Sequence, residues 1–160
     1  CNLNHFILIN NKSKNLLETI KSRCLEIRII MTYKQKDKIL NQLVNLFNQK
    51  IILDKNKVIT SPGNFLKFNN MFFEDYLNIK NDLFINLKNV LNFYKKEKDL
   101  FYKDLSFFLI EYYLQKERVE KEFTHHKFIE KRSALLKNIN DYFLYNLNQN
   151  TLFNTIEGKI

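Results

Sequence analysis

From Phe72 onward the sequence contains no proline, and its one glycine in this stretch is Gly158. Glycine and proline are the residues that most often interrupt helices, so the stretch can run as helix with few breaks. Three segments repeat apolar residues at intervals of three and four. They are Leu83, Leu87, Val90, Leu91 and Tyr94; then Leu100, Leu105, Phe108, Leu109, Tyr112 and Tyr113; then Phe128, Ile129, Leu135, Leu136, Ile139, Tyr142 and Phe143, with Arg132 among them. Three such segments predict a helical bundle.

Aromatic residues are concentrated in the second of these segments. Phe107, Phe108, Tyr112 and Tyr113 cannot all face one core, because neighbouring helical positions point about 100° apart. We expect most of them in the bundle core, and the remainder to be exposed on a surface that contacts a partner.

A smaller helical region precedes the bundle. Thr32 can cap a helix in which Ile39, Leu40, Leu43, Leu46 and Phe47 recur at helical spacing. Further on, Ser61-Pro62-Gly63 predicts the start of another helix, with serine as N-cap and proline in the first helical position.

At the start of the chain, two apolar runs flank a short helical segment. The runs are Phe6–Ile9 and Leu25–Ile30, and residues 14–21 between them suffice for about two helical turns. This order predicts a βαβ unit with two parallel strands. Arg23, where the helix ends, is expected to lie at the sheet edge and to face outward. Cys24 is expected to be a small buried apolar residue.

The polar residues of this unit carry a family resemblance. A strand followed by Asn10-Asn11, a short helix and Ser22-Arg23-Cys24 before a second strand resembles the AAA+ clamp-loader family, which opens and closes the sliding clamp in DNA replication. The resemblance implies that Asn11 is the sensor 1 residue. It also implies that Arg23, flanked by Ser22 and Cys24, is an arginine finger that completes the ATP site of an adjacent subunit. A guanidinium supplied by another subunit raises the rate of phosphoryl transfer by a factor of about 10³–10⁵.

The helix that is predicted to start at Ser61-Pro62-Gly63 narrows the resemblance to one branch of the family. ATP-hydrolysing members carry a sensor 2 arginine near the start of this helix, where Ser61-Pro62-Gly63 places a glycine. This is similar to delta-prime-like subunits of bacterial DNA polymerase III, which keep the finger but do not hydrolyse ATP. Asn146-Leu147-Asn148 resembles a sequence near the end of their collar domains.

The expected fold is therefore mostly α, with three parts. Residues 1–31 are the incomplete end of a parallel α/β AAA+ core with two strands, residues 32–71 a helical lid, and residues 72–160 an all-helical collar that mediates oligomerisation. No phosphate-binding loop of the G-x-x-x-x-G-K-[ST] type is present. Two parallel strands cannot bury both faces of a sheet, so we expect the chain to be N-terminally truncated by roughly a hundred or more residues.

The resemblance implies a role without catalysis by this chain alone. The chain itself binds no cofactor, while ATP and Mg²⁺ belong to the neighbouring subunit. Its partners are the other subunits of the hetero-oligomeric loader, the sliding clamp and primed DNA, and it is expected in the cytoplasm without a membrane contact. Neither a secretion signal nor an apolar run of about 18 residues is present.

Two alternative functions stay open. One is an ATP-hydrolysing motor subunit (gamma- or tau-like) of the same loader, which an intact phosphate loop upstream would favour. The other is a basic helical module that binds nucleic acid, suggested by the net charge of +9. A metal site is not expected, because His125 and His126 are adjacent and point in different directions on a helix. The acidic residues Glu117, Glu120, Glu122 and Glu130 alternate with basic ones and predict a solvated face.

Overall fold

The computed structural model describes residues 6–9, 15–27, 29–121 and 124–157, and these residues form seven helices and no strand. The prediction of a mostly helical protein is confirmed. The chain divides into two compact units, Cys1–Thr32 and Tyr33–Ile160. Across the described ranges, no helix is both long enough and apolar enough to cross a bilayer.

The first unit contains one short helix, α1 (Glu18–Lys21), which buries no residue. The two predicted strands are not seen: Phe6–Ile9 and the described part of Leu25–Ile30 have no regular secondary structure. Phe6, Ile9 and Ile29 are 88%, 87% and 87% exposed. A strand needs a neighbour for its backbone hydrogen bonds and a layer over each apolar face, and the described residues of this unit supply neither.

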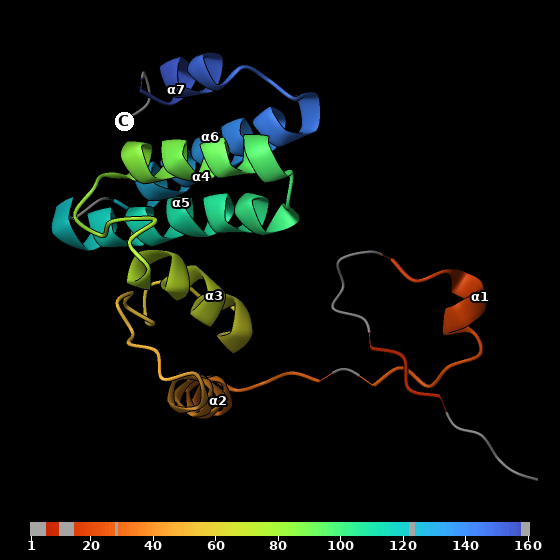
Figure 1. Ribbon diagram of the computed structural model, residues 1–160. Helices are drawn as coiled ribbons and strands as arrows, with labels where there is room; N and C mark the ends of the chain where they lie inside the picture. The colour runs from red at the N-terminus through yellow and green to blue at the C-terminus, as the bar shows by residue number, and fades with distance from the viewer. Residues whose placement is uncertain (1–5, 10–14, 28, 122–123, 158–160) are drawn as a thin grey trace, which may run out of the picture. The chain divides into compact units, whose positions relative to one another are not determined.

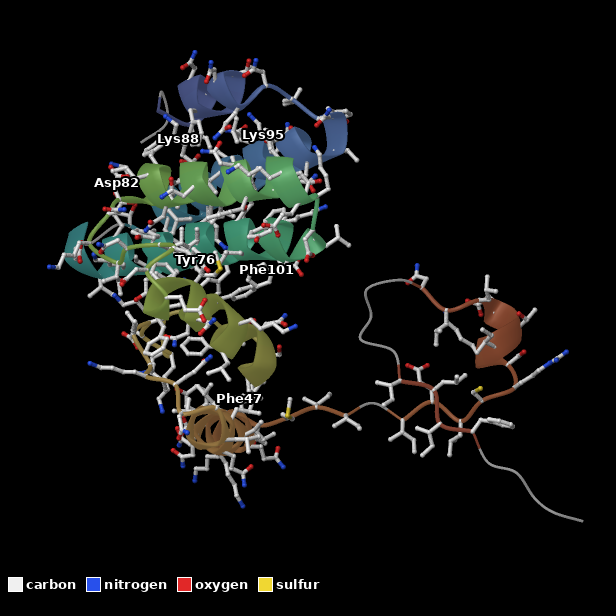
Figure 2. All side chains as sticks on the ribbon, viewed as in Figure 1. Phe47, Tyr76, Asp82, Lys88, Lys95 and Phe101 are labelled. Carbon is white, nitrogen blue, oxygen red and sulfur yellow. The ribbon has the colours of Figure 1, made fainter. Side chains whose placement is uncertain are left out.

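The second unit begins with two helices that pack together, α2 (Tyr33–Leu46) and α3 (Pro62–Phe73). Helix α2 starts directly after Thr32, as predicted, and buries Leu40. Leu46 and Phe47, predicted on the same apolar face, are instead exposed (73% and 59%). The helix ends at Leu46, and Phe47 follows directly after it (Figure 2).

The bundle consists of α4 (Leu83–Glu97), α5 (Leu100–Lys121), α6 (His125–Tyr145) and α7 (Gln149–Glu157). Helix α5 packs against both α4 and α6, and α7 packs on α6 (Figure 1). The side chain of Lys95 in α4 donates a hydrogen bond to Gln149 Oε1 at the start of α7, at 2.7 Å. The predicted boundary between lid and collar at residue 72 stays a prediction.

All three apolar segments predicted for the bundle face its core. Leu87, Leu109 and Ile139, one from each segment, are fully buried. Leu100 and Ile129 are exceptions, at 69% and 49% exposed. Leu100 is the first residue of α5, whereas Ile129 follows the buried Phe128 and therefore points about 100° away from it on α6.

The expectation of exposed aromatic residues on α5 is wrong. Phe108 and Tyr112 are buried, and Phe107 and Tyr113 are half-buried against the core. Phe107 contacts Phe143 of α6 with ring centroids 6.2 Å apart, and Phe108 contacts Phe68 of α3 at 4.8 Å. Aromatic residues of α5 that point in different directions therefore each meet another part of the unit. Phe108 meets α3, Phe107 meets α6, Tyr113 bonds to Asn86 of α4, and Tyr112 bonds to the backbone of Asp54 between α2 and α3.

Candidate functional site

Ser22, Arg23 and Cys24 follow directly on the last residue of α1. The backbone N–H of Ser22 donates to the carbonyl of Glu18 at 2.9 Å, and that of Arg23 donates to Ile20 at 3.1 Å. The hydroxyl of Ser22 also donates to the carbonyl of Thr19, at 3.2 Å. These bonds satisfy carbonyls that a helix end otherwise leaves without partners. The backbone from Ser22 to Arg23 is therefore tied to the short helix that precedes it.

The Arg23 side chain is exposed, and among the described residues it has no ion pair or hydrogen bond. The other cation at this helix end is engaged: Lys21 Nζ lies 2.8 Å from Glu18 Oε1. The hydrogen bond to Glu18, helped by its charge, raises the pKa of Lys21 above its ordinary value. The guanidinium of Arg23 is therefore exposed, and a guanidinium has the planar fork of donors that suits a phosphate.

The other two residues of the predicted site have different outcomes. Cys24 is an exposed free thiol, so the expectation that it is buried is wrong. Its burial depended on a strand and a covering layer that the described part of this unit does not contain. Asn11, the predicted sensor 1 residue, lies outside the described residues.

The start of α3 has the predicted geometry. Ser61 is the N-cap and its hydroxyl accepts a hydrogen bond from the Asn64 N–H at 3.3 Å, while Pro62 occupies the first turn. Gly63 is exposed, its φ is not positive, and a Cβ built on it would meet no atom within 4 Å. Neither backbone strain nor crowding of a Cβ atom therefore demands glycine here.

A cavity of about 350 Å³ lies where α4 begins, and no sequence pattern indicated it. Leu114 and Leu135 form part of its apolar wall. Its rim carries three lysines and three carboxylates, namely Lys80, Lys116, Lys131, Asp82, Glu117 and Glu120. The 2.7 Å ion pair between Lys131 and Glu117 joins α6 to α5 and balances part of that charge. With three charges of each sign, these residues carry no net formal charge.

Among the acidic residues predicted on a solvated face, Glu117 of α5 also makes a contact with another helix. Arg132 of α6 pairs with Glu111 of α5, just as Lys131 pairs with Glu117. Within α6, His126 Nε2 lies 3.2 Å from Glu130 Oε1. In the parts of the chain that are described, no three His, Cys, Asp or Glu side chains are grouped to hold a metal ion.

Sequence reasoning missed two polar residues at the centre of the fold. Asn69 and Asn86 are fully buried, and their side chains bond to backbone atoms of the loops before and after α3, respectively. Asparagine is frequent throughout this sequence, so no local pattern separates these two from the exposed ones.

Comparison with known proteins adds no relative to this description. No family model, no curated protein and no solved structure matches the chain.

Proposed function

We propose that this chain is part of a delta-prime-like subunit of a bacterial DNA polymerase III clamp loader, and that Arg23 acts in trans on the ATP site of a neighbouring subunit. The observation that carries the proposal is the state of Arg23. It stands within Ser22-Arg23-Cys24 at the end of a helix, exposed and with no ion pair among the described residues.

The chemistry follows from the charge that phosphoryl transfer develops. Negative charge spreads over the oxygens of the γ-phosphoryl group in the transition state, and a guanidinium placed against them stabilises it. Arg23 would supply that group, while the neighbouring subunit holds ATP and Mg²⁺. The other cation near this turn, Lys21, is already paired with Glu18. In the proposal, Arg23 is therefore the cation that binds the phosphate.

The exposed apolar segments of the first unit fit the same proposal. Phe6–Ile9 and the residues after Cys24 have the composition of buried parallel strands but no cover among the described residues. In the proposal, they are the last strands of an AAA+ core whose other strands and helices lie outside this sequence.

The second unit would then provide the lid and the collar. Gly63 removes the sensor 2 arginine, which fits a subunit that does not hydrolyse ATP itself. The bundle of α4–α7 would hold the subunit in the ring with its partners and so couple hydrolysis to closure of the sliding clamp on primed DNA.

The test is the ATPase rate of the reconstituted loader, with clamp and primed DNA present, when the full-length subunit carries Arg23→Ala. We expect the rate at one site to fall by about a hundredfold or more, with ring assembly unchanged. Arg23→Lys should restore little of it, because an ammonium keeps the charge but lacks the fork.

Lys21→Ala is the matched control, since it removes a cation from the same turn that is already paired. It should leave the rate unchanged. Hydrolysis that persists in Arg23→Ala would reduce Arg23 to a helix-end residue and would refute the proposal.

A further inference from the structure

An aromatic cluster joins α3 to the bundle. The Phe68 ring lies 4.8 Å from that of Phe108 and 5.8 Å from that of Phe101, measured between centroids. Phe65 meets Phe108 edge to face at 6.5 Å. Figure 2 shows Phe101 at the boundary between α5 and α3. Phe65, Phe68 and Phe108 are each at most 5% exposed, so the contact between the two regions is core rather than surface.

Asn69 of α3 binds the segment between α2 and α3 by hydrogen bonds, next to this aromatic cluster. Its side-chain oxygen accepts hydrogen bonds from the N–H groups of Ile52 (2.7 Å) and Leu53 (3.1 Å). Its amide nitrogen donates to the carbonyl of Lys50 at 2.8 Å. The side chain is fully buried, where each unmade bond would cost the full desolvation of a polar group. The segment 50–53 is therefore bound to α3 by bonds that water cannot replace.

Tyr112 of α5 bonds to the next residue of that segment. Its hydroxyl accepts a hydrogen bond from the Asp54 N–H at 3.2 Å, and burial raises the pKa of Tyr112. The segment is thus held by α3 through Asn69 and by α5 through Tyr112.

A second asparagine repeats this arrangement in the connection between α3 and α4. The Asn86 side chain donates to the carbonyl of Asn78 (2.8 Å) and to the hydroxyl of Tyr113 in α5 (2.6 Å). The Tyr113 hydroxyl in turn donates to the carbonyl of Asn81 at 2.8 Å. Both loops next to α3 are therefore bonded to α5, the first through Asp54 and the second through Asn81, and the second loop is also bonded to α4 through Asn78.

We propose that the described residues of the second unit, 33–121 and 124–157, form one rigid arm, in which the α2–α3 region and the bundle open and unfold together. A single hydrophobic core runs from Leu40 in α2 to Ile156 in α7, and the two asparagines close the loops that would otherwise act as hinges. This inference does not depend on the role of Arg23. If the proposed function holds, the arm carries a displacement of the bundle undiminished to Tyr33.

Amide hydrogen exchange in the full chain tests the proposal. The exchange rates are measured separately on peptides from α3 and from α5. Elements that open only in a shared event have matching protection, so we expect the slowest amides of the two helices to agree within about tenfold. Exchange of α3 a hundredfold or more faster than that of α5 would overturn the rigid arm.

Tyr112→Phe sharpens the test because it deletes one hydroxyl and keeps the ring in the core. Loss of one hydrogen bond should lower the protection of α3 and α5 together, by about three- to tenfold. Tyr145→Phe is the matched control: Tyr145 is 67% exposed, and its change should alter neither helix. A fall in protection confined to one helix in Tyr112→Phe would also contradict the proposal.

Discussion

The two units of this protein use similar apolar residues with opposite results. In Cys1–Thr32, Phe6 and Ile29 are almost fully exposed, whereas in Tyr33–Ile160, Leu87 and Ile139 are fully buried. A helix makes its backbone hydrogen bonds within itself and needs cover along one face only. A strand needs a neighbour and a covering layer from elsewhere in the chain. Apolar sequence is therefore enough to build the second unit, but not the first.

The largest expected difference in stability between the two units comes from replacing one isoleucine by alanine in each unit. Ile139→Ala leaves a cavity in the bundle core and should cost about 2–5 kcal/mol in the free energy of unfolding. Ile29→Ala, at an 87% exposed side chain, should change it by less than about 0.5 kcal/mol. Denaturant unfolding measures both. A comparable loss in Ile29→Ala would mean that the first unit has a core of its own.

A smaller effect is expected from a buried polar residue. Asn86→Ala leaves the Asn78 carbonyl without its partner and should destabilise the second unit by about 1–3 kcal/mol. Asn92→Ala is the control, because Asn92 is exposed on the same helix. Equal midpoints of chemical unfolding for the two variants would show that the loop does not depend on Asn86.

The stability of the second unit at high pH should depend on the ionisation of Tyr102. Burial, followed by the hydrogen bond to Glu97, raises the pKa of Tyr102 from 10.0 to about 12. A folded-state pKa above the unfolded one means that the unfolded protein loses this proton first, so this contribution to stability is complete below pH 10 and is lost between pH 10 and 12. In Tyr102→Phe, stability should fall less steeply across this window, as thermal unfolding at a series of pH values would measure. An unchanged slope would refute the assignment.

The smallest effect is expected at the start of α3. Gly63→Ala should stabilise the protein by about 0.4–1 kcal/mol, because alanine restricts the unfolded chain and fits the helix without contact. Thermal unfolding is a sufficient measurement, with Lys67→Ala as a control on the exposed side of the same helix. Destabilisation by Gly63→Ala would show that the glycine is required by the fold.

Local patterns predicted the helices and failed where contacts are distant in sequence. Ser61 and Pro62 marked the start of α3 correctly because capping involves neighbours only. The expectation that some of Phe107, Phe108, Tyr112 and Tyr113 are exposed was wrong, because one helix was considered without the elements that surround it. Cys24 was misjudged for the related reason that its cover was assumed. Asn11 and the family assignment stay predictions.

The sequence by itself determined that α2 to α6 are helices, although not α7, and that Ser22-Arg23-Cys24 follows a helix. Spacing of apolar residues, caps and the absence of helix breakers act over a few residues, within reach of one helical turn. Only the tertiary structure decided that Phe107 and Tyr113 are covered and that the segment Phe6–Ile9 is exposed. It also decided that Asn69 and Asn86 hold two loops by hydrogen bonds. Burial depends on which segments meet, and segments that meet are brought together by the fold as a whole.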